Sequence, residues 1–246
     1  MKYAIKDFFT KLNGIKIVES ADYTNIELLK NTATAISRAT GSGIYIFDYF
    51  RQNLLFVSDN IMQWCKLLPI SVKRDGYEAF LKYIPEEDLQ MLIDINDAAF
   101  EFWNTHKEIS PINYVLSYDF RFGINMVHQT YTPIVIKGDR IWLAMCIASF
   151  SSQTKPGNIV MNHEDKSYEY SLTDCQWHVK EAVTLTDREK EILKYASQGL
   201  STKEIAKLTN TSINTIKTQK SHLFKKINVK SISEAIRYSV NNILLQ

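Results

Sequence analysis

Five lysines and no acidic residue lie between Ser212 and Lys230. On a helical wheel at about 100° per residue, Ser212–Ile227 places its aliphatic side chains on one side: Ile213, Ile216, Leu223 and Ile227. The opposite arc carries polar and basic side chains: Asn214, Lys217, Thr218, Ser221, His222 and Lys225. Lysines neutralise phosphates, while hydroxyl and amide groups reach base edges in the major groove of DNA. A helix of this kind has the chemistry of a DNA-reading helix, although a basic helix face is often only a solvated one.

Capping signals define four helices around this segment. Thr186–Glu189, Ser201–Glu204 and Ser231–Glu234 each have the spacing of a capping box, and Ser212 is an N-cap for the helix that ends near Ile227. Gly199 is a natural left-handed stop for the first helix, and Asn210 tolerates the same conformation in the next turn. The connections are about three residues long. The sequence therefore predicts a compact all-α unit.

We expect apolar side chains of the other three helices to form the core of this unit. The expected inward residues are Ile192, Leu193, Ala196, Ile205, Ala206, Leu208, Ala235, Ile236 and Val240.

This pattern resembles the LuxR-type helix-turn-helix from end to end. The matching segments are Leu185–Leu193, Gly199, Ser201–Ala206, Ser212, Thr215–Lys217 and Lys226–Val229. The resemblance implies a four-helix unit in which the third helix reads the major groove and the fourth commonly supports dimerisation.

The same resemblance assigns roles by position. Lys217, Thr218 and Ser221 correspond to base-facing positions of the family. The positions that contact the DNA backbone are Lys220, Lys225, Ser201 and Ser212. Two residues depart from the family pattern: Gln219 stands where His is usual, and Ile232 where Arg is usual.

Charge is distributed unevenly along the chain. The 246 residues carry a net charge of +2, but Leu185–Gln246 holds 11 Lys and Arg against 5 Asp and Glu, leaving 18 against 22 for the remainder. A basic C-terminal part on a mildly acidic body is the pattern expected when one end of a chain meets a polyanion. Double-stranded DNA is therefore the expected partner.

The residues before about 152 predict a different architecture. Strands are expected at Gly43–Phe50, Leu54–Ser58, Ile112–Phe122, Ile124–Ile136 and Arg140–Phe150. Helices are expected inside this series, at Asn60–Leu68, Gly76–Tyr83 and Glu86–His106, and before it, at Tyr3–Leu12 and Asn25–Ala39. This order describes a five-stranded antiparallel sheet with inserted helices, so the whole chain is of the α+β class.

This part is similar to PAS-type sensor domains, chiefly through Tyr83–Leu89 and the strand Arg140–Phe150. We therefore expect a PAS-like sensor domain at 1–152, a linker with a small hairpin at 153–184 and the helix-turn-helix domain at 185–246. A small-molecule ligand is possible in such a domain, but the sequence identifies neither ligand nor cofactor.

The strand Arg140–Phe150 is apolar on both faces. Ile141, Leu143, Met145 and Ile147 are expected on one face, and Trp142, Ala144, Cys146 and Ala148 on the other. One face requires cover from the inserted helices, and the other from an N-terminal helix or a second subunit.

Several residues of the sensor-like part allow two interpretations. His128 is either a haem ligand or, more often for a strand histidine, a hydrogen-bonded core residue, and Cys146 beside it is either a redox sensor or a small apolar residue. Trp64, Trp103, Trp142 and Tyr131 either line a cavity or fill the core. Glu86, Glu87 and Asp88 are best explained as the negative first turn of a helix.

Other classes of protein find little support. The longest apolar stretch, Ile141–Phe150, is half of the ~20 residues that cross a bilayer, and the N-terminus lacks the apolar core of a signal peptide. Cys65, Cys146 and Cys175 are few and scattered, which suggests a reducing cytoplasm. There is no nucleophile–base pairing, glycine-rich phosphate loop or metal-ligand spacing.

The resulting hypothesis is a homodimeric bacterial transcription regulator whose sensor-like domain receives a signal or mediates dimerisation. The main alternative is a protein-interaction module, for example one that docks on an RNA polymerase subunit. A steep salt dependence distinguishes DNA binding from apolar docking. An enzyme would need a catalytic pair that the sequence does not display.

Overall fold

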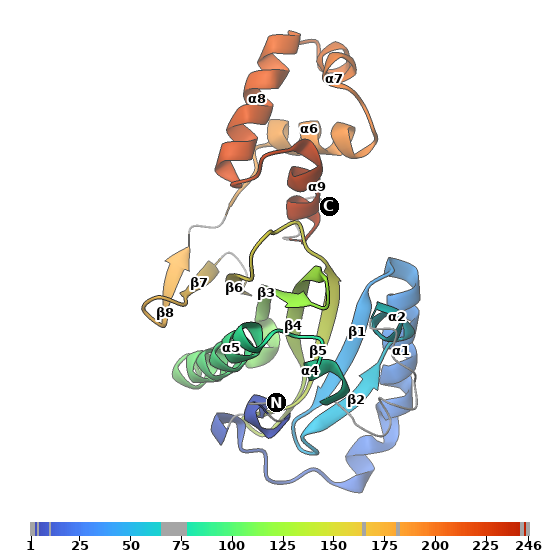
Figure 1. The fold of residues 1–246 in the computed structure, drawn as a ribbon, viewed down its shortest axis with the longest axis vertical. Coiled ribbons are helices and arrows are strands. Elements are labelled where there is room, and N and C mark those ends of the chain that lie inside the picture. The colour runs from blue at the N-terminus through green and yellow to red at the C-terminus, as the bar shows by residue number, and fades with distance from the viewer. Residues whose placement is uncertain are drawn as a thin grey trace. The chain divides into compact units, whose positions relative to one another are not determined.

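The computed structural model describes residues 3, 5–9, 11–64, 78–163, 166–180, 183–241 and 244. Its chain divides into two compact units, Met1–Lys180 and Glu181–Gln246, each with its own core (Figure 1). Within the described part, no helix combines the length and the apolar character needed to cross a membrane.

The first unit is built on one antiparallel sheet. Its strands are β1 (Gly43–Asp48), β2 (Asn53–Val57), β3 (Val115–Phe122), β4 (Asn125–Lys137), β5 (Arg140–Phe150), β6 (Gly157–His163), β7 (Lys166–Ser171) and β8 (Gln176–Lys180). They lie in the order β2-β1-β5-β4-β3-β6-β7-β8. The first five strands, in the order β2-β1-β5-β4-β3, form the five-stranded antiparallel sheet that the sequence predicts.

The strand count differs from the prediction of five. Residues 153–184, expected to be a linker with a hairpin, supply three further strands, because β6 pairs along β3. The hairpin of β6 and β7 is confirmed. The added strands also join the core, since the Trp177 indole on β8 donates to the Ala98 carbonyl at 3.2 Å.

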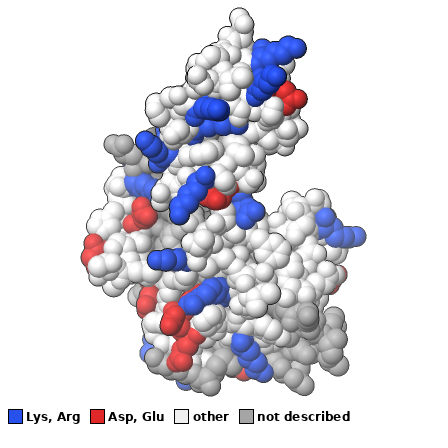
Figure 2. All heavy atoms as spheres, turned by 45° about the horizontal axis from the view of Figure 1, so that its top comes forward, with Lys and Arg blue, Asp and Glu red and all other residues white. Residues whose placement is uncertain are grey.

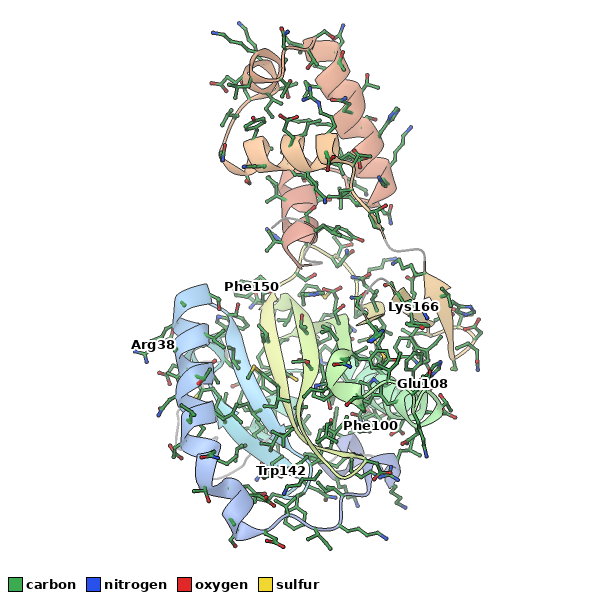
Figure 3. The ribbon with its side chains drawn as sticks, turned by 180° about the vertical axis from the view of Figure 1, so that it is seen from behind. Arg38, Phe100, Glu108, Trp142, Phe150 and Lys166 are labelled. Atoms are coloured by element: carbon green, nitrogen blue, oxygen red, sulfur yellow. The ribbon has the colours of Figure 1, made fainter. Side chains whose placement is uncertain are left out.

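Helices cover both faces of the sheet. The long α1 (Ile26–Thr40) lies over one face, where Ile26 and Ala33 pack with Trp142 and Met145 (Figure 3). On the other face α5 (Glu86–Thr105) buries Leu89, Ile95 and Trp103. The face of the sheet opposite α5 is therefore covered by α1, a helix from the N-terminal part of the chain, which is one of the two alternatives that the sequence predicts.

The alternation predicted for β5 is wrong at its start. Trp142 and Leu143 pack in the same cluster under α1, and Ile141 packs in the other. The pairing of β4 with β5 shifts its register between Pro133 and Ile136, opposite these residues. A bulge of this kind inserts an unpaired residue, which turns the next side chain to the other face.

The first N-terminal helix is also different from the prediction. Tyr3–Leu12 was expected as one helix, but the chain forms short 3-10 turns, η1 (Ile5–Phe8) and η2 (Lys11–Asn13). The Asn13 side chain then bonds the backbone of Ile141, donating to its carbonyl at 2.8 Å and accepting from its amide at 3.0 Å. These bonds attach the segment as a strap beside β5.

Between β2 and α5, the described residues form the short helices α2 (Asp59–Trp64) and α4 (Glu78–Leu81). They overlap the predicted helices Asn60–Leu68 and Gly76–Tyr83. Residues 65–77, including Cys65, lie outside the described residues.

The second unit has the four predicted helices, α6 (Asp187–Ser197), α7 (Thr202–Leu208), α8 (Ile213–Lys226) and α9 (Ile232–Asn241). Ile192, Leu193, Ile205, Ala206 and Ala235 are buried as expected. Leu208 and Val240 are each 60% exposed, so their predicted burial is wrong. Both stand at the last turns of short helices, where none of the described helices covers them.

The acidic first turn of α5 has a second role beyond the helix dipole. Asp88 is 1% exposed and accepts from the Arg121 amide at 2.6 Å and from the Arg121 Nε at 3.1 Å. Glu87, which is exposed, contacts the same guanidinium at 2.8 Å. The pair therefore fastens the start of α5 to β3.

Replacing Asp88 is expected to destabilise the first unit. Asp88→Asn keeps the shape but removes the charge that Arg121 faces, and should lower the free energy of unfolding by about 2–3 kcal/mol. Glu87→Gln is the control, with an expected loss below about 1 kcal/mol because Glu87 is solvated. Urea unfolding followed by tryptophan fluorescence measures both, and equal losses would contradict the anchoring role of Asp88.

Candidate nucleic-acid interface

The orientation of α8 is fixed by two fully buried side chains. Ile216 packs with Ile192, Ile205 and Ala206 in one cluster, and Leu223 packs with Leu193 in a second. Both Ile216 and Leu223 are 0% exposed. The third predicted core residue, Ile227, is buried, but Ile213 is 40% exposed, so its predicted burial is wrong. Ile213 occupies the first position of the helix, at the edge of the cluster.

Hydrogen-bonding caps set where α7 and α8 begin. The Ser212 hydroxyl accepts from the Thr215 amide at 3.0 Å, and Ser201 and Glu204 form the predicted capping box. Hydrogen bonds from the Ser201 hydroxyl and amide lower the pKa of the Glu204 carboxyl, which stays ionised at the helix start. Asn210, with a φ of 48°, makes the left-handed turn between the two helices.

The outer side of α8 is open to solvent. All but one of the predicted DNA-facing residues are exposed; the exposed set is Asn214, Lys217, Thr218, Ser221, His222, Lys225, Ser201 and Ser212. The visible face of the second unit, at the top of Figure 2, shows many Lys and Arg side chains and few acidic ones. The structure thus brings these side chains together as one basic, hydrogen-bonding surface, which we call the α8 face.

Lys220 is the exception. It is partly buried, its Nζ donates to the Thr202 hydroxyl at 3.1 Å, and burial lowers the pKa of its ammonium group. Lys220 therefore links α8 to the first turn of α7. Lys226 is likewise engaged, in an ion pair of 2.8 Å with Glu189. Of the lysines on α8, Lys217 and Lys225 are the ones exposed without such a link.

Sequence reasoning missed a residue that holds α8 in place. Arg188 on α6 donates from Nε to the Gln219 side chain at 3.3 Å and from Nη2 to the Thr211 hydroxyl at 3.1 Å. Its Nη1 pairs with Glu191 at 2.5 Å. The signal was the departure at Gln219, because the oxygen of a side-chain amide can accept from a guanidinium.

The second departure, Ile232, also has a structural place. Its side chain is partly buried against the cluster formed by Leu185, Leu223 and Ile227. An apolar residue at the start of α9 therefore extends the core of the unit.

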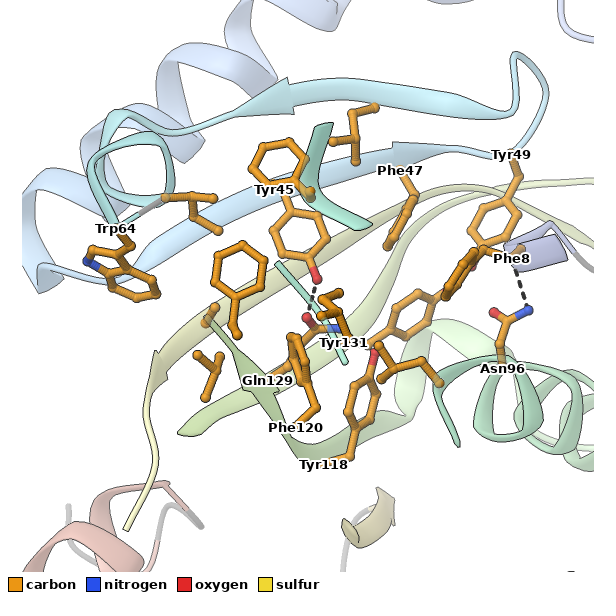
Figure 4. A pocket seen from close by; sticks show the side chains of 18 residues that line it. Phe8, Tyr45, Phe47, Tyr49, Trp64, Asn96, Tyr118, Phe120, Gln129 and Tyr131 are labelled. Carbon is orange, nitrogen blue, oxygen red and sulfur yellow. Dashed lines mark hydrogen bonds between the residues drawn. The ribbon is translucent and has the colours of Figure 1, made fainter. Parts of the chain in front are cut away.

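In the first unit, aromatic side chains surround a small inner cavity of about 60 Å³ between the sheet and α5. Gln129 lies at its centre and is 2% exposed; its amide accepts from the Tyr45 hydroxyl and donates to the Tyr118 hydroxyl (Figure 4). Trp64 and Tyr131 line this cavity. Trp103 does not line the cavity but stacks on Tyr131 with ring centroids 5.8 Å apart, and Trp142 packs in the other cluster, so the aromatic residues serve both as lining and as core.

His128 faces away from the inner cavity. Its neighbours Val127 and Gln129 line the cavity, so His128 lies on the opposite face of β4. Its Nδ1 stands 3.2 Å from the buried Asp119 carboxylate. This placement agrees with the interpretation of His128 as a hydrogen-bonded core residue and not with its interpretation as a haem ligand.

Cys146 does not lie beside His128, contrary to the expectation. The register of β4 and β5 pairs His128 with Ser149 and Cys146 with Tyr131. Cys146 is fully buried, and burial raises the pKa of its thiol. A buried neutral thiol behaves as a small apolar residue.

Comparison with known proteins places the second unit in a family. Residues 183–239 match the model of bacterial regulatory proteins of the luxR family. A probable transcriptional regulator, ycf29, of Pyropia yezoensis is 37% identical over 82 residues, which are 33% of this chain and 36% of that protein. The CsgBAC operon transcriptional regulatory protein of Escherichia coli is 40% identical over 77 residues, 31% of this chain and 32% of that protein. The chain thus spans about a third of the length of these curated relatives.

Two solved structures align over most of the chain. A phage VqmA–DPO complex is 13% identical with a TM-score of 0.33 and covers 90% of each chain. A VqmA–ligand–DNA complex from Vibrio cholerae is 13% identical with a TM-score of 0.30 and covers 88% of this chain and 86% of that one. The family assignment itself rests on the capped four-helix unit and its sequence match. Residues 183–239 are a helix-turn-helix domain of the LuxR family of bacterial regulatory proteins.

Proposed function

We propose that this chain is a sequence-specific, DNA-binding transcription regulator that acts as a homodimer in the bacterial cytoplasm. The observation that carries the proposal is the α8 face, which presents Lys217, Thr218, Ser221 and Lys225 to solvent from a helix whose other side is buried. An α-helix of this shape fits the major groove, where lysines neutralise phosphates and hydroxyl groups reach base edges.

The proposed roles follow from exposure. Lys217, Thr218 and Ser221 face the bases, and Lys225, with the helix-capping Ser201 and Ser212, faces the DNA backbone. Asn214 and His222 flank this set on the same side. Lys220 acts mainly by holding α7 and α8 together, because its ammonium group already donates to Thr202.

The first unit is proposed to receive a signal or to hold two chains together. Its inner cavity, at about 60 Å³, has room for a few water molecules, whereas pockets for small ligands usually span ~300–1,000 Å³. A ligand at Gln129 would therefore require the surrounding aromatic side chains to move apart.

A second candidate function is docking on a protein such as an RNA polymerase subunit. Leu208, Ile213 and Val240 favour it, because they leave apolar surface exposed on the helix-turn-helix domain. Apolar docking depends little on salt, whereas DNA binding depends on it steeply.

The α8 face should bind DNA through its lysines. We expect the affinity of the full chain for its operator to fall steeply between 50 and 200 mM salt, by roughly 10³-fold or more if six phosphates are contacted. Lys217→Ala should weaken binding and reduce the salt slope by about 1, and Lys225→Glu should weaken binding further. Fluorescence anisotropy with labelled operator DNA measures these changes.

The matched control is Lys155→Glu, the same charge reversal at an exposed lysine of the first unit. It should leave the operator affinity nearly unchanged, with circular dichroism confirming that all variants fold. If Lys225→Glu and Lys155→Glu bind alike, long-range charge and not the α8 face governs binding. A flat salt response would favour the docking function.

A homodimer should require two half-sites on one face of the duplex. One reading helix contacts only a few base pairs, so we expect two half-sites about 10–10.5 base pairs apart. Inserting about five base pairs between them places the second half-site on the opposite face and should abolish cooperative binding. Footprinting of the altered operators measures this, and equal protection at every spacing would show that each chain binds alone.

A further inference from the structure

A second cavity opens at the end of α5, away from Gln129 and the inner cavity. It has a volume of about 360 Å³ and is walled by α5, the strap of η2 and the turn between β4 and β5. Its more accessible apolar lining comes from Leu12, Ile109 and Ile136, and the buried side chains of Phe100 (labelled in Figure 3), Trp103 and Ile141 lie behind them. We call it the α5-end cavity. Its volume falls within the ~300–1,000 Å³ range of small-molecule sites, which the inner cavity does not reach.

Hydrogen bonds hold the walls of this cavity in place. Asn13 bonds the amide and carbonyl of Ile141, and the Leu12 carbonyl accepts from Arg140 at 2.6 Å and from Asn104 at 3.3 Å. All four of these residues line the cavity, together with Leu12 itself. A ligand therefore meets a preformed site and does not have to order the strap, which lowers the entropic cost of binding.

The charge of the cavity is positive because one cation lacks compensation. Arg140 forms an ion pair with Asp139 at 3.3 Å, and its guanidinium donates to the Leu12 carbonyl and to the side-chain oxygen of Asn104. Lys107, at the cavity rim, makes no hydrogen bond or ion pair with any described residue. Asp139 is the one acidic residue among those that line the cavity. The ammonium group of Lys107 is thus available to an incoming anion.

We propose that the α5-end cavity binds a small monocarboxylate with an apolar alkyl or aryl body. The body lies against Leu12, Ile109 and Ile136, and the carboxylate pairs with the Lys107 ammonium group at the rim. A hydrogen bond between two ionised groups is stronger than one between neutral groups, so Lys107 selects the acid over an alcohol of the same length. This binding is independent of the DNA-binding function proposed above.

Octanoate is the probe, tested on the purified full chain without DNA by isothermal titration calorimetry. We expect one saturable site in the unaltered chain. Lys107→Gln should weaken octanoate binding by about three- to fivefold, since an ion pair at an exposed ammonium group is lost. Octan-1-ol, which lacks the charge, should bind the unaltered chain more weakly by a similar factor and should respond little to Lys107→Gln.

Two further variants locate the site. Ser110→Trp places a large ring at the exposed rim of the cavity and should abolish octanoate binding. Lys155→Gln, an exposed lysine outside the cavity, should change nothing. Circular dichroism checks that the variants fold. If Ser110→Trp fails to fold, Lys107→Gln, which changes an exposed side chain, still tests the proposed site.

The proposal is overturned if octanoate fails to bind, if Lys107→Gln binds it as well as the unaltered chain does, or if octan-1-ol binds as tightly as octanoate. Undiminished binding by folded Ser110→Trp would place the ligand elsewhere and overturn it too. Operator binding, measured separately by anisotropy, stays intact in Lys107→Gln, so the failure of one proposal is distinguishable from the failure of the other.

Discussion

The helix-turn-helix domain depends on the burial of two side chains, Ile216 and Leu223, on one side of α8. They lie seven residues apart, about two helical turns, and each enters a different cluster. Two anchors prevent α8 from rotating about its axis, whereas a single anchor would leave rotation possible. Because α8 cannot rotate, Lys217, Thr218 and Ser221 stay on the solvent side, and the surface that meets a ligand is fixed before the ligand arrives.

A comparable constraint acts on the first unit, whose sheet is apolar on both faces. Leaving either face in water costs about 25 cal/mol for each Å² of apolar surface, so both need cover. The chain provides α1 on one side and α5 on the other. Covering the sheet in this way leaves α5 with one end near the β4–β5 turn, and this is where the strap, Arg140 and Lys107 surround the α5-end cavity.

The features that the sequence predicted depend on interactions between residues close together in the chain. The features that it missed depend on interactions between residues far apart in the chain. Capping residues such as Ser201 and Ser212 act within four residues, so the helix starts were predicted. The exposure of Ile213 was missed because a helical wheel gives the side of a residue but not where the neighbouring helix ends. The separation of Cys146 from His128 depends on strand register, and the joining of β6 to β3 depends on pairing across forty residues, neither of which local patterns reveal. The role of Arg188 was missed for the same reason, since Thr211 and Gln219 lie 23 and 31 residues away from it in the chain.

The network around Arg188 decides how Gln219 should be understood. Gln219 lies on α8 at a position where the family usually has His. A different residue there could be taken to mean a different contact with DNA. Its side-chain oxygen, however, accepts from Arg188, which also bonds Thr211 and pairs with Glu191. The substitution is thus matched by a guanidinium from α6, which ties α8 and the turn before it to the first helix. Gln219 belongs to the scaffold that positions α8. Under the proposed function, the selection of bases therefore falls to Lys217, Thr218 and Ser221, whose exposed side chains face solvent.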